Sequence, residues 1–283
     1  MNTLSTYGAR NKYFQAMYDQ VLRRALIAEK ITNRRSDNLK TIQNPYGSQP
    51  TATIQAVAGT YSVSTWTITD DTLTVTDEII YAEHILRHED IFAEFDLGAS
   101  RMNELMFAVA AGADKFVLNN LCEDATGTYT TPAGGFQASN IITILSNLSA
   151  KVAGYSDAYK GMYLVLENSD IPGFIQAMAT TGYSMADAAL NNGFMASYLG
   201  IDLYVTRDGT FVDATIGSTT VTNDGHRVFG VKGVATVATP GGVEYEELKV
   251  TTKTGYEIRV SQLIGFKLWA QKAALTVDIT VSA

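Results

Sequence analysis

The sequence predicts an α+β fold in which some elements project from the main body. Three patterns support this expectation: a long helical repeat over residues 89–122, a hydroxyl-rich hairpin pattern over residues 59–78, and alternating helix and strand patterns through the second half of the chain. The chain has 283 residues, of which 46% are apolar, so it can bury a sizeable core. We expect one large domain or two closely packed ones.

The longest helical pattern lies over residues 89–122. Its apolar residues recur every three or four positions, and Gly98 and Gly112 weaken the pattern only modestly. A helix of about 25 residues is roughly 38 Å long at about 1.5 Å per residue. We expect it to act as a beam that connects distant parts of the protein. The pattern is carried by Met102, Leu105, Met106, Val109, Ala113, Phe116, Val117 and Leu121.

Residues 59–78 alternate apolar side chains with serine and threonine, which predicts a β-hairpin. Asp70 and Asp71 stand between the apolar sets and predict its turn. Because a lone two-stranded ribbon is marginally stable in water, we expect this one to lie against something else, such as another chain. The candidate residues for that contact between subunits are Tyr61, Val63, Trp66, Ile68, Leu73 and Val75.

The first part of the chain is basic, although the whole chain has a net charge of −8. Residues 1–40 contain eight Lys/Arg and three Asp/Glu, a net charge of +5, so the remaining residues carry −13. Residues 12–30 predict an amphipathic helix, and the stretch that follows, to residue 50, predicts an extended arm or linker. This basic arm is either a solvated surface or a contact for a polyanion or an acidic neighbouring subunit. Its candidate residues are Arg23, Arg24, Lys30, Arg34 and Arg35.

The second half of the chain predicts alternating helices and strands. Asp170 is a candidate cap for a helix with Pro172 in its first turn. Residues 191–209 predict a short apolar helix, then a tight turn at Gly200, then a strand through Leu203 and Val205. Three further strand patterns complete the chain. They are VEYEELKVTT, LIGFKLWA and ALTVDITVSA.

No group of residues makes a convincing reactive site, so we predict no catalytic site, cofactor or metal, and no enzyme. His84 and His88 stand four apart, as metal ligands on one helix face do, but Ile85 occupies the position where a zinc protease has glutamate. Ser184 is better explained as a helix cap than as a nucleophile. Four further residues have structural explanations. Glu244, Glu246 and Glu247 fit the wet face of a strand, and Cys122, the one cysteine, fits a buried apolar site.

The sequence also lacks the patterns of a membrane span and of a signal peptide. We therefore expect no membrane partner and a protein made in a cytosol. A long helix, a projecting hairpin and a basic arm without a reactive cluster suit assembly better than catalysis. The fifteen tyrosines agree with this expectation, because tyrosine is suited to interfaces.

The order of these parts resembles the major capsid proteins of tailed bacteriophages, which have the Hong Kong 97 fold. The stretch SYLGIDLYVTRDG, with Gly200 at the turn, is similar to a turn of the axial domain in that family. The stretch GYEIRVSQLIGFKLWAQKAALTVDI is similar to the closing strands of the family. The resemblance implies an N-terminal arm, an extended β-hairpin loop, a long spine helix, a peripheral β-sheet domain and a mixed α/β axial domain. The implied ranges are 1–50 for the arm, 51–80 for the extended loop, 81–135 for the spine helix with part of the peripheral domain, 136–243 for the axial domain and 244–283 for the closing strands of the peripheral domain.

The resemblance implies a structural protein that self-assembles, through pentamers and hexamers, into the icosahedral or prolate head of a virion. The head would enclose double-stranded DNA, which it would contact without reading sequence, and would be assembled in the host bacterial cytoplasm. The further implied partners are a portal protein, a separate scaffolding protein and a decoration protein. Because residues 51–80 contain no lysine, we predict no crosslink of the kind that joins a loop lysine to an asparagine of a neighbour in some relatives.

Two alternatives to the viral capsid remain open at this point. The first is an encapsulin-like cellular compartment, which shares the fold and encloses enzyme cargo. The second is a hydrolase or another α/β enzyme that uses His84, His88, Ser184 or the Glu244 group. The enzyme would need these side chains within hydrogen-bond reach of one another in a single pocket.

Overall fold

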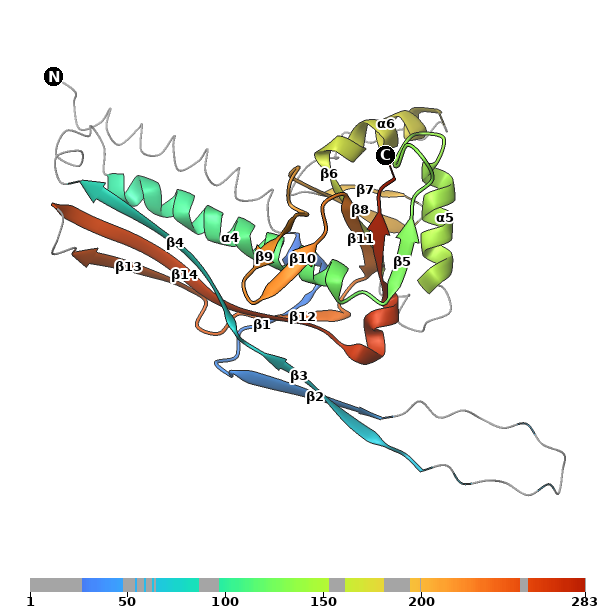
Figure 1. Cartoon of the computed structure of the whole chain (residues 1–283), viewed down its shortest axis with the longest axis horizontal. Helices are drawn as coiled ribbons and strands as arrows, with labels where there is room; N and C mark the ends of the chain where they lie inside the picture. The colour runs from blue at the N-terminus through green and yellow to red at the C-terminus, as the bar shows by residue number, and fades with distance from the viewer. Residues whose placement is uncertain are drawn as a thin grey trace.

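Two β-sheets joined by one long helix form the body of the protein, and a two-stranded ribbon extends away from it (Figure 1). The helix is α4 (Leu97–Glu123), which corresponds to the predicted beam. The computed structural model describes residues 27–47, 54, 59, 63, 65–86, 97–152, 161–180, 194–198, 200–249 and 254–282.

A five-stranded sheet, here called the peripheral sheet, lies along the first half of α4. Its strands are β1 (Asn33–Arg35), β4 (Asp77–Leu86), β12 (Ala235–Ala238), β13 (Val243–Lys249) and β14 (Gly255–Leu268). The first half of β14 pairs with β13 on one side and β4 on the other, and its second half pairs with β12. Alternate side chains of β14 and β4 pack against α4, because successive residues of a strand face opposite sides of the sheet. This small core consists of Ile85, Leu105, Val109, Ile258 and Val260.

A mixed six-stranded sheet contains most of the buried residues. Its strand order is β5 (Gly127–Thr130), β15 (Thr276–Thr280), β11 (His226–Val231), β6 (Met162–Glu167), β8 (Ile201–Thr206) and β7 (Phe194–Tyr198). The helices α5 (Ile141–Val152) and α6 (Ile171–Thr180) accompany this sheet, together with the short 3-10 helices η2 (Asn168–Asp170) and η3 (Ala270–Leu275). β6 lies in the middle of the sheet, and its residues Tyr163–Glu167 are all buried, as expected for a strand that is covered on both faces.

The second half of α4 completes the core of the six-stranded sheet, which also includes α2 (Ala28–Ile31). The segment Glu104–Glu123 is long and apolar enough to cross a membrane, but 56% of its most apolar window is buried inside the fold. That degree of burial is typical of a core helix. The hairpin of β9 (Asp213–Ile216) and β10 (Thr219–Thr222) contacts α4. Its turn is held by Asp77 of β4, whose Oδ1 accepts a hydrogen bond from the Ser218 N–H at 2.7 Å.

The projecting ribbon differs from the predicted hairpin. It is formed by β2 (Thr41–Gly47) and β3 (Ile68–Thr74), which pair in register from Thr41 opposite Thr74 to Gly47 opposite Ile68. The predicted turn at Asp70 and Asp71 is therefore wrong, because β3 runs straight through these residues. Residues 41–47, which the sequence analysis places in an extended arm or linker, are extended and pair with β3.

Three other expectations from the sequence differ from the structure. The residues before Gly200 form β7, so the predicted helix-to-strand turn is a turn between two antiparallel strands, in which Gly200 has a φ of 78°. β15 lies in the six-stranded sheet rather than among the closing strands of the peripheral domain. His84 lies on strand β4 rather than on a helix face, and His88 is outside the described residues.

Candidate assembly surfaces

The base of the ribbon is fixed to the body of its own chain. Leu73 is fully buried and packs with Ala238 and Trp269. The carboxylate of Asp71 accepts a hydrogen bond from the backbone N–H of Ala270 at 2.8 Å and lies 3.2 Å from the Lys267 ammonium group. This contact explains why two consecutive aspartates can lie within a strand. Asp70 is exposed to solvent, and Asp71 forms an ion pair with Lys267.

The outward face of the ribbon presents apolar side chains to solvent. Trp66 is 66% exposed and Ile68 is 57% exposed. The Trp66 indole lies directly over Gly47 on the opposite strand, where an added Cβ would come within 2.0 Å of the indole Nε1. Glycine at this position therefore lets the large ring lie flat on the ribbon. Beyond the paired strands, Ile54 and Val63 are also exposed. These exposed apolar side chains make the ribbon a candidate interaction surface.

The six predicted ribbon residues thus fall into three groups. Val63, Trp66 and Ile68 are exposed, whereas Leu73 is buried and Val75 is packed beside Leu73. Leu73 therefore belongs to the internal core and is not available to a neighbour. Tyr61 lies outside the described residues.

The basic residues near the start of the described chain have acidic or aromatic neighbours in their own chain. Arg34 forms an ion pair with Glu29, and Arg35 forms one with Asp37. The Lys30 ammonium group lies 5.8 Å from the centre of the Tyr204 ring, and burial lowers the pKa of this lysine. Of the five predicted basic residues, Arg23 and Arg24 lie outside the described residues.

Asp114 attaches the start of the described chain to α4. Its carboxylate accepts hydrogen bonds from the backbone N–H groups of Ile27, at 2.8 Å, and Ala28, at 3.0 Å. Helix α2 has no side-chain cap of its own at Ile27, so Asp114 caps it from 86 residues away. The carboxyl group is nearly fully buried, and this burial raises its pKa to about 7 despite the two hydrogen bonds. The only indication of this attachment in the sequence is that Asp114 is an acidic residue within the apolar run of α4.

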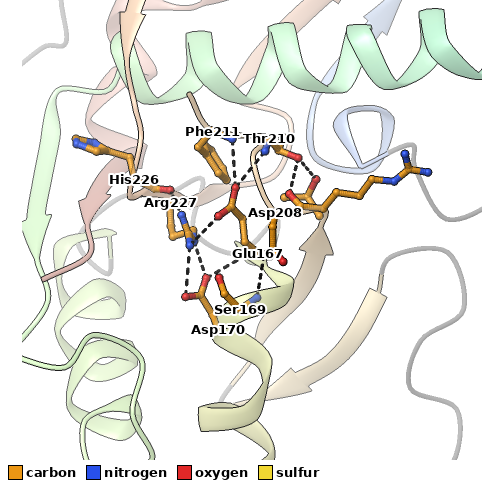
Figure 2. Close-up of polar contacts among 10 residues, drawn as sticks. Glu167, Ser169, Asp170, Asp208, Thr210, Phe211, His226 and Arg227 are labelled. Atoms are coloured by element: carbon orange, nitrogen blue, oxygen red, sulfur yellow. Dashed lines mark hydrogen bonds and ion pairs between the residues drawn. The ribbon is translucent and has the colours of Figure 1, made fainter. Parts of the chain in front are cut away.

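A buried polar network holds η2, β6 and β11 together (Figure 2). The Arg227 guanidinium group lies 3.0 Å from a Glu167 carboxylate oxygen and 2.5 Å from an Asp170 oxygen. Glu167 also accepts the backbone N–H groups of Thr210, at 3.1 Å, and Phe211, at 3.3 Å. The Asp170 Oδ2 atom, which Arg227 contacts, also accepts a hydrogen bond from the backbone N–H of Glu167 at 3.0 Å. Donors and acceptors therefore satisfy one another, which is the arrangement of a structural network.

The predicted reactive residues do not come together in the described part of the chain. His84 lies on β4 in the peripheral sheet. All seven residues of β13 are exposed, including the Glu244 group. Among the described residues, no group of three or more His, Cys, Asp or Glu side chains could hold a metal ion. Ser184 is outside the described residues, and Cys122 is buried.

Comparison with known proteins finds no matching family model and no matching curated protein. Solved structures do match over nearly the whole chain. The capsid of cyanophage P-SCSP1u matches with a TM-score of 0.69 at 11% identity, over 92% of this chain and 89% of that one. A structure from Mycobacterium phage Che8 matches with a TM-score of 0.68 at 15% identity, over 88% of each chain.

The chain has the Hong Kong 97-like capsid fold. A crystal structure of a virus-like particle from Pyrococcus furiosus also matches, with a TM-score of 0.58 at 10% identity, over 95% of this chain and 98% of that one. Identities this low establish the fold but do not transfer a function.

Proposed function

We propose that this protein is the major capsid protein of a tailed bacteriophage, a structural protein without catalytic activity. The match to phage capsids over about nine-tenths of both chains carries the proposal. In this role, copies of the chain assemble through pentamers and hexamers into a closed head that encloses double-stranded DNA. Assembly takes place in the host bacterial cytoplasm, with a portal protein and a separate scaffolding protein as partners. A decoration protein is a further candidate partner.

The ribbon supplies a physical reason for self-assembly. Its base is fixed to its own chain, but Trp66 and Ile68 stay exposed, and covering each of them would stabilise an assembly by roughly 1.5–3 kcal/mol before ordering costs. Each contact is modest on its own. A subunit that makes several such contacts at once is held strongly, because all of them must break together for the subunit to leave.

Electron microscopy of the purified, expressed protein tests this proposal. We expect closed polyhedral particles, and in particles from infected cells we expect DNA that is protected from nuclease. A protein that stays monomeric or dimeric under all conditions, with or without its scaffolding protein, would contradict the proposal.

An encapsulin-like compartment is the second candidate function. The likeness to the virus-like particle from Pyrococcus furiosus, which covers 98% of that chain, favours it. The contents of native particles separate the two candidates. A phage head contains DNA, whereas a cellular compartment contains protein cargo held by a peptide in an apolar pocket of the inner wall.

A further inference from the structure

A pocket of about 210 Å³ lies between α4 and the peripheral sheet, beside α2 and β1. On the helix side its wall includes Ala110 and Ala113, whose small side chains leave room against the sheet. On the sheet side its wall includes Val243 of β13, and Gln262 and Ile264 of β14. We call this space the edge pocket, because β13 is the last strand at this side of the described sheet.

The side chain of Gln262 indicates that the edge pocket has an occupant. Gln262 is only 6% exposed, yet its side-chain amide has no hydrogen-bond partner among the described residues. Its neighbours on the same face of β14, Val260 and Ile264, are apolar and fully buried. Buried polar side chains normally have a hydrogen-bond partner. We therefore expect a polar atom to enter the edge pocket and pair with this amide.

The size and the largely apolar wall of the edge pocket fit an aromatic ring that carries one polar atom. An apolar cavity of about 150 Å³ holds a benzene ring, so the larger edge pocket has room for an indole ring. A buried indole N–H usually finds an acceptor, and the Gln262 side-chain oxygen is one. A purely aliphatic side chain would fill the space but leave the amide unpaired.

The chain displays such a ring on its ribbon. Of its two tryptophans, Trp269 is buried, whereas Trp66 is 66% exposed. The Trp66 ring lies over Gly47, but no hydrogen bond holds it there among the described residues. Exposed side chains change rotamer within nanoseconds, so the ring can swing towards a neighbour. Residues 65–69 around it are uncharged and can approach the glutamates of β13 without repulsion.

Trp66 stays out of reach of the edge pocket of its own chain. The ribbon is fixed at Leu73, seven residues away, which is about 23 Å along an extended strand. Leu73 packs on Ala238, whereas the next residue back, Val237, lines the edge pocket. Successive residues of a strand face opposite sides of a sheet. The base of the ribbon and the edge pocket therefore lie on opposite faces of the peripheral sheet.

We propose that Trp66 of one copy inserts into the edge pocket of a second copy, where Gln262 accepts a hydrogen bond from the indole N–H. The inference rests on the proposed function, because it requires the chain to assemble with itself. The anchor and its receptor lie on different parts of the chain, so each copy gives one tryptophan and receives another. Such a head-to-tail contact closes into a ring when the rotation between copies allows it, which is the geometry that pentamers and hexamers need.

Iodide quenching of tryptophan fluorescence follows Trp66 directly, because Trp269 is buried. We expect iodide to quench Trp66 readily in unassembled subunits, and we expect most of this quenching to be lost in purified particles. Ala113→Leu fills the edge pocket, so Trp66 should stay quenchable in any particles that this variant forms. Urea unfolding checks that the variant subunit is folded. Ala110→Leu fills the same pocket from the neighbouring turn and replaces Ala113→Leu if that variant is unfolded.

A double-mutant cycle shows whether the ring and the pocket meet each other. The measured quantity is the protein concentration at which half of the subunits sediment as particles. Trp66→Ala and Ala113→Leu should each raise it about tenfold or more. The double variant should raise it no further than the stronger single variant, because both substitutions remove one contact. Ile175→Ala is the control: Ile175 is an exposed residue of α6, and its effect should multiply with that of Ala113→Leu.

The outcomes separate this contact from the proposed function. Particles of the unchanged protein in which iodide quenches Trp66 as fully as in the subunit would overturn the contact alone. Independent effects of Trp66→Ala and Ala113→Leu would also overturn the contact alone. If the unchanged protein forms no particles under any condition, the proposed function fails and the contact fails with it.

Discussion

Replacing Asp114 with asparagine tests how the start of the chain is held on α4. The substitution keeps the size of the side chain and removes its charge. The pKa of Asp114 is raised to about 7, mainly by burial and to a smaller extent by Glu29, although the N–H groups of Ile27 and Ala28 and the charge of Lys30 lower it. An asparagine oxygen can still accept one of the two backbone N–H groups, so α2 keeps part of its cap.

The sign of the effect follows from where the proton is held. The unfolded chain releases this proton near its ordinary pKa of 3.8, whereas the folded chain holds it until about pH 7. The folded state therefore binds more protons between these values. The contribution of Asp114 to the free energy of unfolding falls as the pH rises from about 4 to 7, and it is constant above that. At about 1.4 kcal/mol per pKa unit, the full change is roughly 4 kcal/mol.

Urea unfolding of the unassembled protein at pH 5, 6, 7 and 8 measures this contribution. We expect the stability of Asp114→Asn relative to the unchanged protein to rise by roughly 3 kcal/mol across the series, because about two pKa units lie between pH 5 and the pKa of Asp114. Titrations of other groups cancel in that difference. Asp37→Asn is the control, because Asp37 is exposed, and its difference from the unchanged protein should stay flat. If the Asp114→Asn difference is equally flat, the buried carboxyl does not titrate as described.

Three further substitutions test the other surfaces. Arg227→Met should destabilise the subunit by about 3–5 kcal/mol in urea unfolding, because it leaves the buried carboxylates of Glu167 and Asp170 without their cation; a loss below about 1 kcal/mol would contradict the network. Leu73→Ala should cost about 2–5 kcal/mol by the same measurement, and an unchanged midpoint would mean that the ribbon base is not fixed. Trp66→Ala should change the stability of the subunit by less than about 0.5 kcal/mol but reduce the yield of particles in sedimentation; normal particle yield would exclude Trp66 from the subunit contact.

The elements with strong internal patterns could be predicted from the sequence. The 3.6-residue repeat of α4 depends on residues close in sequence, and the described helix covers Leu97–Glu123, whereas residues 89–96 of the predicted range lie outside the described residues. The resemblance in the order of parts led to the capsid fold, which the comparisons with solved structures confirm.

The pairing of the ribbon could not be predicted because its partner strands are distant and poorly patterned. β2 contains Asn44 and Pro45, which are rare inside strands, and it pairs with a strand that carries Asp70 and Asp71. These residues are tolerated because the ribbon has only two strands and because Lys267 neutralises Asp71. No local pattern in the sequence indicates that ion pair.

The attachment of α2 to Asp114 could not be predicted for a similar reason. An aspartate in an apolar helix indicates a buried charge, but not which backbone groups it binds. The helix predicted before Gly200 was wrong for another reason. A five-residue apolar run such as Phe194–Tyr198 fits a short helix as well as an edge strand, and its pairing with β8 decides the matter.

The short link between the ribbon and the peripheral sheet has a mechanical consequence. Only Val75 and Thr76 separate β3 from β4, so a pull on the ribbon along its length passes directly into β4. β4 is joined to β14 by ten consecutive residue pairs, from Gly255 opposite Leu86 to Ile264 opposite Asp77. Such a pull shears the whole ladder and loads its bonds side by side, instead of peeling them apart one after another. Tension applied to the ribbon would therefore be carried by the longest pairing among the described strands, that of β4 with β14.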